Sequence, residues 1–355
     1  MDSRSVLLAA LACTLSGCSA VEFYWQGIAG QADLLARAKP MAEIIATTSD
    51  PVLKARLVRT QAIRAFASRE LALPENRSYT SYADLGRPFV LWNVFAAPEL
   101  ALTARQWCFP VAGCVAYRGY FAEADARKEA ARLAAAGDDV HLGGVPAYST
   151  LGYFNDAVLS TFVRYREVEL ARLIFHELAH QIVYVKDDTS FNESFATAVE
   201  EAGMQRWLAA ERNTRGPVEA AELVADAARG QRLRAAFRTL IATTRNRLAS
   251  LYASTASDDE KRAGKAAAFA EMRAAYERQK ATSDGAAAFD RWFAAGANNA
   301  GIVAAGLYAD RVPQFSAMLA AEHGDFARFY GRVKILAALP KDEREPALIA
   351  AARHD

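Results

Sequence analysis

The stretch Ile174–His180 reads Ile-Phe-His-Glu-Leu-Ala-His and places two histidines four residues apart. On a helix, residues at this spacing lie one above the other on the same face, so both imidazoles could reach a single metal ion. The surrounding residues are mostly apolar and predict a helix that is packed in a core: Leu173, Ile174, Leu178, Ala179, Ile182 and Val183. We therefore expect a buried helix over about Asp156–Val185 that carries His176 and His180 as metal ligands.

A second motif supplies a third ligand. The polar run Val185–Ser190 is typical of a loop whose last residues cap a helix, and the next helix is expected over about Phe191–Leu208. This helix would return antiparallel to the first and place Glu193 in its first turn, facing the histidines. Catalytic zinc sites use three protein ligands and keep one position open, so His176, His180 and Glu193 predict a site for one Zn²⁺.

Two histidines at this spacing can also be structural core residues. The chain has only 5 histidines, so a chance occurrence of His-Glu-x-x-His is improbable. No cysteine lies near the motif, which excludes a closed cysteine-rich zinc site.

The two motifs resemble those of the gluzincin metallopeptidases. His176–His180 matches their zinc motif, and Asn192–Glu200 is similar to the Asn-Glu-Gly-Phe-Ala run of aminopeptidase N-like enzymes, with Ser194 in place of glycine. The whole chain looks most like the bacterial putative aminopeptidase family, although the rest of the resemblance depends on looser stretches such as Gly143–Phe154. The resemblance implies that His176, His180 and Glu193 are zinc ligands and that Glu177 is the general base.

The implied chemistry is peptide hydrolysis. Zinc lowers the pKa of a water to about 7 and polarises the scissile carbonyl, while Glu177 takes the water proton and passes it to the leaving amine. A phenol could stabilise the oxyanion, and Tyr308 is the first candidate, followed by Tyr148. An aminopeptidase also needs a carboxylate for the free α-amine, for which Glu200 or Glu201 are candidates; Glu200 could equally lie on the helix surface or support a ligand.

The first residues predict an exported lipoprotein. The apolar run Val6–Leu15 is too short for a bilayer core that needs about 20 residues, but it suits a secretory signal. Leu15–Cys18 matches the bacterial lipobox, so we expect residues 1–17 to be removed and Cys18 to be lipidated. The alternative is a buried first helix. Ser19 after the cysteine favours the outer membrane, with the protein facing the periplasm.

The remaining cysteines agree with an oxidising compartment. Cys13 would leave with the signal peptide, so Cys108 and Cys114 remain, on either side of a segment that contains proline and glycine. This spacing suits a hairpin closed by a disulfide.

Composition describes a soluble globular chain of 355 residues with 52% hydrophobic and 23% charged residues. The net charge of +1 gives no reason to expect nucleic acid as a partner. We expect a peptidase domain over 18–355, with a sheet-containing lobe to about residue 155 and a helical lobe beyond it. The sequence does not indicate an oligomeric state.

The fold class expected is α+β, mostly helical with a small mixed or antiparallel sheet beside the zinc-binding helix. Two short aromatic and β-branched runs predict strands, Phe89–Ala96 and Cys114–Phe121. Helices are expected over these ranges: Phe23–Arg37, Pro51–Leu71, Glu123–Ala136, Val218–Ala253, Asp258–Thr282, Gly285–Ala294, Asn298–Tyr308, Val312–Ala321 and Asp325–Leu336.

Val140–Tyr148 predicts an extended edge segment, because Pro146 does not suit the middle of a sheet. Peptidases often hold the substrate backbone as an added strand, so Gly143, Gly144, Val145 and Tyr148 are candidate substrate-binding residues. The alternative is a plain glycine-rich turn. His141, a single histidine, is expected to be structural.

Three functions remain open. The first is a zinc aminopeptidase acting on peptides, the second is a zinc endopeptidase acting on envelope proteins, and the third is a zinc-binding lipoprotein scaffold without turnover. Glu177 argues against the scaffold, because a structural site needs no base. The two peptidase alternatives share every residue named above.

Overall fold

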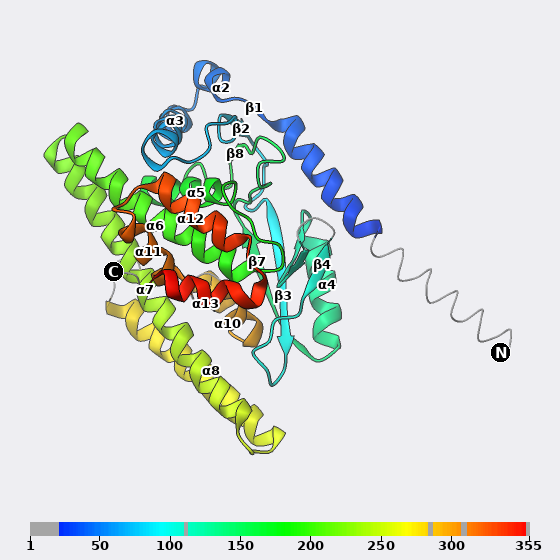
Figure 1. Cartoon of the computed structure of the whole chain (residues 1–355). Coiled ribbons are helices and arrows are strands. Elements are labelled where there is room, and N and C mark those ends of the chain that lie inside the picture. Colours follow the sequence, from blue (N-terminus) through cyan, green and yellow to red (C-terminus); the bar gives the residue numbers. More distant parts are fainter. Residues whose placement is uncertain (1–20, 110–112, 283–286, 307–310, 353–355) are drawn as a thin grey trace.

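The structure is a computed structural model that describes residues 21–109, 113–282, 287–306 and 311–352. It is 64% helical, with sheets of two or three strands, which confirms the mostly helical α+β fold expected from the sequence. Figure 1 shows the two helices of the central motif, α5 (Glu167–Ala179) and α6 (Thr189–Thr214), in the middle of the molecule, with the sheet on one side and the last helices packed across another.

The first part of the chain is a helix over residues 21–37 followed by α2 (Met41–Thr47) and α3 (Pro51–Leu71). The α3 bounds are those expected, because the helix carries clear local signals. The Asp50 side chain accepts hydrogen bonds from the Val52 and Leu53 backbone N–H groups at 2.9 and 3.0 Å, and Pro51 occupies the first helical position. The helix ends where Ala72 adopts a left-handed conformation.

The largest sheet has β3 (Leu91–Pro98) at its centre, with β6 (Arg118–Tyr120) and β7 (Asp138–Val145) antiparallel on either side. Helix α4 (Glu123–Ala135) covers one face, where Trp92 and Val94 pack against it. The other face carries Asn93 and Phe95, since successive side chains alternate across a strand. The extended segment expected near residue 140 is therefore an edge strand, among the parts of the chain described.

Two smaller sheets complete the β structure. One joins β1 (Lys39–Pro40), β2 (Ser81–Ala83) and β8 (Val158–Leu159), with β2 and β8 parallel. The other is the hairpin of β4 (Trp107–Phe109) and β5 (Gly113–Val115), in which a disulfide joins Cys108 and Cys114.

The central helix α5 (Glu167–Ala179) is shorter than the helix expected over residues 156–185. At its start, Val158 and Leu159 pair with Tyr82 and Ala83, and the Asp156 carboxylate accepts hydrogen bonds from Thr150. The pairing with β2, about 75 residues away in the sequence, overrides the apolar pattern. At its end, residues 181–182 form a turn, and helix α6 (Thr189–Thr214) then begins two residues earlier and ends six residues later than expected.

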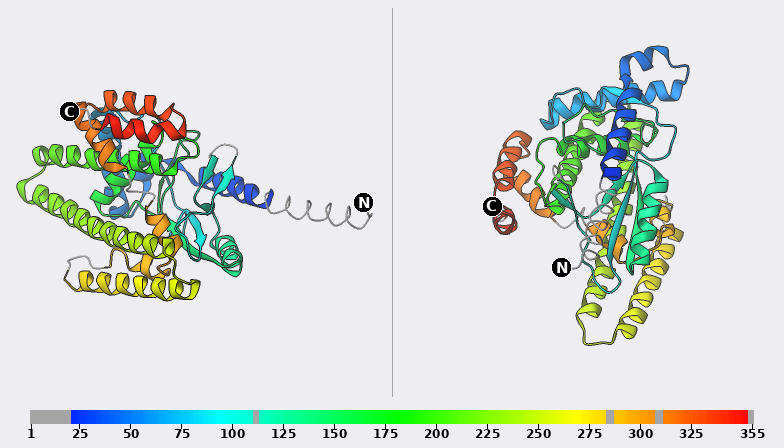
Figure 2. Two further views of the ribbon diagram at one scale, coloured as in Figure 1. Left: turned by 60° about the horizontal axis from the view of Figure 1, so that its bottom comes forward. Right: turned by 90° about the vertical axis from the view of Figure 1, so that its right-hand side faces the viewer.

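The remaining helices agree with the sequence except at a few places. They are α7 (Pro217–Ala253), α8 (Asp258–Thr282), α9 (Asp290–Ala294), α10 (Asn299–Gly306), α11 (Val312–Ala321), α12 (Phe326–Ala337) and α13 (Lys341–Ala351). Helix α9 is shorter than expected, and α2 and α13 were not predicted. Figure 2 shows α7 and α8 as a long antiparallel pair along one side of the molecule.

The main apolar core surrounds α5 and α6 and takes members from residues 34–90 as well as 147–348. The expected division into lobes near residue 155 stays a prediction. Phe175 of α5 packs on Phe66 of α3, and Phe66 packs edge-on against Trp207 of α6. Gly203 of α6 permits the close approach of this helix to α5 and α3, because a Cβ there would lie 3.1 Å from the Phe175 ring and 2.8 Å from Leu71. No described helix is long and apolar enough to cross a membrane.

Candidate metal centre

His176 and His180 project from the same face of the central helix, as their spacing predicts. His176 lies in the last turn of α5, and His180 is the residue that caps it, with helical backbone angles (φ −59°, ψ −22°). The two Nε2 atoms are 3.2 Å apart, and the rings meet edge to face. Because the helix around them is buried, neither imidazole depends on a loop for its position.

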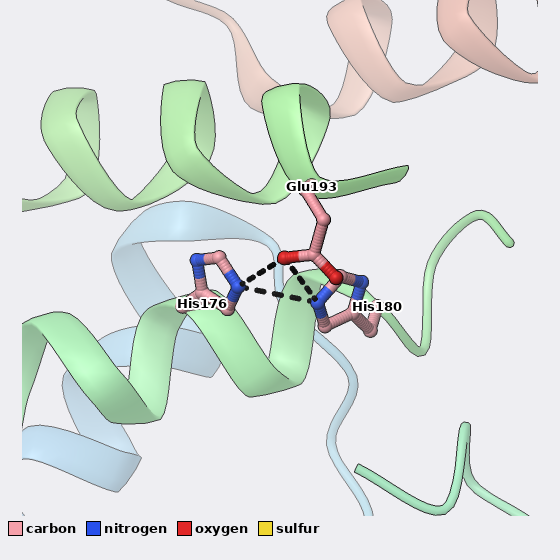
Figure 3. Close-up of side chains that lie close together, drawn as sticks. All are labelled: His176, His180 and Glu193. Atoms are coloured by element: carbon pink, nitrogen blue, oxygen red, sulfur yellow. Dashed lines mark hydrogen bonds and ion pairs between the residues drawn. The ribbon is translucent and has the colours of Figure 1, made fainter. Parts of the chain in front are cut away.

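Glu193 reaches the histidines from α6 (Figure 3). Its Oε2 atom lies 3.3 Å from Nε2 of His176 and 3.8 Å from Nε2 of His180. The helix begins at Thr189, so Glu193 lies in its second turn rather than the first turn expected.

The start of α6 is held by two polar side chains. Asp188 caps the helix by accepting a hydrogen bond from the Phe191 N–H at 3.1 Å, and it also pairs with Arg311 and Arg344. The Asn192 side chain both donates to the Val185 carbonyl at 2.8 Å and accepts from the Val185 N–H at 2.7 Å. These contacts fix the loop and the helix turn on which Glu193 sits.

The donor atoms of His176, His180 and Glu193 all lie within 4.8 Å of one another. In a tetrahedral zinc site with ligands at about 2.0–2.2 Å, neighbouring ligand atoms are about 3.3–3.6 Å apart. The measured separations of 3.2, 3.3 and 3.8 Å agree with that geometry. Two imidazole nitrogens and one carboxylate oxygen are also the donor set that zinc prefers in open sites, so the residues fit this metal.

A further carboxylate orients His176. The Nδ1 atom of His176 lies 3.1 Å from Oε2 of Glu200, which is about two turns beyond Glu193 on α6, and the other oxygen of Glu200 pairs with Arg172. An Nδ1–H donated to Glu200 leaves the Nε2 lone pair of His176 free for a metal. The corresponding Nδ1 of His180 is buried and has no hydrogen-bond partner among the described residues.

The pKa values of the cluster reflect two imidazoles held beside a carboxylate. Burial alone would raise the pKa of Glu193, but the two imidazoles offset this effect and hold the pKa below its usual value. Burial lowers the pKa of His180 to about 4, which keeps its imidazole neutral and able to bind metal at neutral pH.

Glu177 follows His176 on α5, and its environment suits a general base. Burial raises the pKa of its carboxyl to about 7, opposed by His176 and reinforced by the charges of Glu193 and Asp156. A base with a pKa near neutrality can both accept and release a proton. Two phenols that the sequence does not single out, the buried Tyr79 and the partly buried Tyr117, lie within electrostatic range of Glu177. Nothing in their local sequence distinguishes them from core tyrosines.

The structure brings only part of the expected substrate-binding set to the site. Gly143, Gly144 and Val145 line a cavity that also touches His176 and Glu200. Tyr148 instead donates its hydroxyl to Gln31 and packs on Phe121. Glu201 faces Arg238 at 3.6 Å. His141 is buried on β7 and lines the same cavity, and Tyr308 and Cys18 lie outside the described residues.

Comparison with known proteins identifies the family. No curated protein and no solved structure shows significant similarity to the chain. The family described as "Putative aminopeptidase", in contrast, matches residues 22–348, which include both helices of the metal centre and the strands beside them. The match covers nearly the whole sequence, and the chain therefore belongs to the putative aminopeptidase family.

Proposed function

We propose that the protein is a zinc-dependent aminopeptidase. The observation that carries this proposal is the convergence of His176, His180 and Glu193 on one point, with the buried carboxyl of Glu177 beside it. Family membership supports peptidase chemistry, and the ligand geometry supports the metal. A purely structural zinc site would need a fourth protein ligand and no base.

The bound ion would supply Lewis-acid polarisation of the scissile carbonyl and would acidify a water molecule. His176, His180 and Glu193 would hold it. The second carboxylate, Glu200, keeps the Nδ1 proton of His176 in place, so that Nε2 stays unprotonated. Both oxygens of Glu200 are engaged, with His176 and Arg172, and we therefore assign Glu200 to orienting the ligand rather than to binding the substrate amine.

Glu177 would move the proton. Its carboxylate accepts a proton from the attacking water, and its pKa of about 7 allows the same carboxyl to donate that proton to the leaving amine. The donor for the oxyanion stays a prediction. Tyr308 remains the nominated residue, because the hydroxyl of Tyr148 is committed to Gln31.

The substrate backbone would lie along β7. Gly143–Val145 forms part of an edge strand at the cavity, where main-chain groups of a peptide can pair with main-chain groups of the protein. Gly143 and Gly144 carry no side chains, so a peptide backbone can approach this edge closely.

The deciding experiment gives the zinc-loaded protein, from Ser19 onward, a peptide mixture in which each sequence has either a free or an acetylated amino terminus. Trimming of free termini alone is the expected result, and Glu177→Gln should retain zinc but not trim. Internal cleavage of both forms would establish the endopeptidase instead. No cleavage by a protein that holds zinc would support the scaffold.

His180→Ala and Glu193→Ala should each lose zinc, and a Glu193→Ala protein that bound zinc as tightly as the wild type would refute the ligand assignment.

We also propose that Cys18 carries a lipid anchor and that the protein faces the periplasm from the outer membrane. The lipobox supports this proposal, and the disulfide between Cys108 and Cys114 is compatible with an oxidising compartment. Metabolic labelling with a fatty acid should mark the full-length protein and not Cys18→Ser. Equal labelling of both, or of neither, would refute the anchor.

A further inference from the structure

A cavity of about 520 Å³ opens directly beside the metal centre. It shares His176 and Glu200 with the centre and is bounded on another side by Gly143, Gly144 and Val145 of β7. Its volume is within the range of about 300–1,000 Å³ that is usual for small-ligand pockets. A group bound in this cavity would therefore lie against His176, one of the three proposed metal ligands.

One side of the cavity is a continuous series of rings, here called the aromatic wall, formed by Phe95, His141, Trp292, Phe237 and Phe289. Phe289 stacks on Phe237 with centroids 4.0 Å apart, and Phe237 meets Trp292 edge-on at 5.2 Å. Trp292 then lies 5.8 Å from His141, and His141 lies 6.4 Å from Phe95.

The aromatic wall is assembled from distant segments of the chain. Phe95 comes from β3, His141 from β7, Phe237 from α7, and Phe289 and Trp292 from the beginning of α9. Phe237, Phe289 and Trp292 are only partly buried, so the cavity leaves aromatic surface in contact with water. Covering that surface with an apolar group is favourable, because apolar area is removed from water on both partners.

Three arginines also line the cavity, but each is neutralised by a glutamate. Arg172 pairs with Glu200, Arg234 lies 2.9 Å from Glu169, and Arg238 lies 3.6 Å from Glu201. Each pair of arginine and glutamate is close to neutral, so the pairs attract an acidic ligand only weakly. The charges therefore do not select an acidic side chain, and the aromatic wall decides the chemistry of the ligand.

We propose that this cavity is the subsite for a large apolar side chain, aromatic or leucine-like, on the peptide residue at the scissile bond. The proposal rests on the proposed peptidase function and names its substrate class. The main chain of that residue would lie at Gly143, which pairs in register with Asn93. Asn93 also lines the cavity.

The first test measures cleavage preference. The zinc-loaded protein is given peptides that differ only in the residue at the scissile bond, with Phe, Leu, Ala or Asp at that position, and cleavage sites are mapped by mass spectrometry. We expect kcat/KM for Phe and Leu to exceed that for Ala by on the order of 10- to 100-fold, with Asp lowest. Equal rates for Phe and Ala, or a preference for Asp, would overturn the proposal.

A binding measurement separates this proposal from the proposed function. Zinc-loaded Glu177→Gln is titrated calorimetrically with L-phenylalaninamide, L-alaninamide and the α-amide of L-aspartate. Tighter binding of phenylalaninamide by at least about tenfold is expected even if no peptide is ever cleaved. That outcome, without turnover, would support the subsite and refute the peptidase. Cleavage without any side-chain preference would support the peptidase and refute the subsite. If the protein neither bound these amides nor cleaved peptides, both proposals would be refuted.

Two substitutions test the aromatic wall itself. Trp292→Ala should lower the Phe-to-Ala ratio of kcat/KM by at least about tenfold, whereas Trp25→Ala, the same change at an exposed tryptophan remote from the cavity, should not change the ratio. Because Trp292 also packs on Phe293, a folding defect could obscure the result. Ala305→Phe fills the cavity without removing a core ring and should lower the same ratio. An unchanged ratio in a folded Ala305→Phe protein would refute the assignment.

Discussion

The contact between Glu200 and His176 gives the sharpest quantitative prediction. Glu200 Oε2 lies 3.1 Å from Nδ1 of His176, and the Glu200 side chain is only 10% exposed. A hydrogen bond to a charged group in such a position contributes about 1.5–3 kcal/mol. If that energy holds His176 in the orientation and tautomer that bind metal, its loss should weaken zinc binding by about 10- to 100-fold.

Two substitutions of Glu200 should give losses of zinc affinity at the two ends of this range. Glu200→Gln can still offer an oxygen to the Nδ1–H but loses the charge, so we expect a loss of zinc affinity near tenfold. Glu200→Ala removes the acceptor altogether and should approach 100-fold. Glu201→Ala is the matched control, because it removes the neighbouring carboxylate, which faces Arg238 instead of a histidine.

The assay is competition for zinc against a chromogenic chelator at fixed pH and ionic strength, with circular dichroism as a check on folding. Removing Glu200 also deprives the partly buried Arg172 of a partner, so a lower stability is expected and must be separated from the metal effect. Zinc affinity of a folded Glu200→Ala protein within threefold of the wild type would refute the proposed orienting role.

Three further predictions concern stability. Asp188→Asn should destabilise the protein by about 3–5 kcal/mol in urea unfolding, because asparagine can still cap α6 but loses the charge that pairs with Arg311 at 3.0 Å and with the buried Arg344 at 2.7 Å; a loss below about 1 kcal/mol would contradict this account. Burial lowers the pKa of His141 from 6.5 to about 4, so the unfolded chain takes up a proton before the folded one does as pH falls through this window. The wild type should therefore lose roughly 2 kcal/mol more stability between pH 7 and pH 5 than His141→Gln does, and equal losses would show that His141 titrates normally. Zinc at about 100 times its Kd should stabilise the wild type by about 2.7 kcal/mol relative to chelated protein, and His180→Ala should show no such difference in thermal melts.

The sequence predicts those elements whose signals are local. Helix α3 carries its own capping residue and proline, and α8 and α11 have the bounds expected from their periodicity. The expectation of a helix over residues 156–166 is wrong, because Val158 pairs with Tyr82, a partner far away in the sequence. Helix α13 was missed, since Pro346 within it argues against a helix when only the local pattern is read.

The same distinction holds within the site. The two histidines and Glu193 can be found from spacing, because each motif lies on one short stretch of chain. Glu200 could have been placed more firmly from sequence, since it lies seven residues, or about two turns, beyond Glu193 on the same helix face. The aromatic wall could not have been predicted from the sequence, because nearly two hundred positions separate its first and last members and only the tertiary fold brings them together.

The double hydrogen bond between Asn192 and Val185 bears on how the protein would acquire its metal. It joins the loop after α5 to the first turn of α6 without any contribution from a cation. The ligand helices are also packed together through Phe175 and Gly203, a contact that involves none of the proposed metal ligands. Zinc fingers, in contrast, fold only when the ion binds. Here we expect zinc to bind to an already folded protein and to be removable by chelation without unfolding. The occupancy of the site should then follow the concentration of free zinc in the compartment.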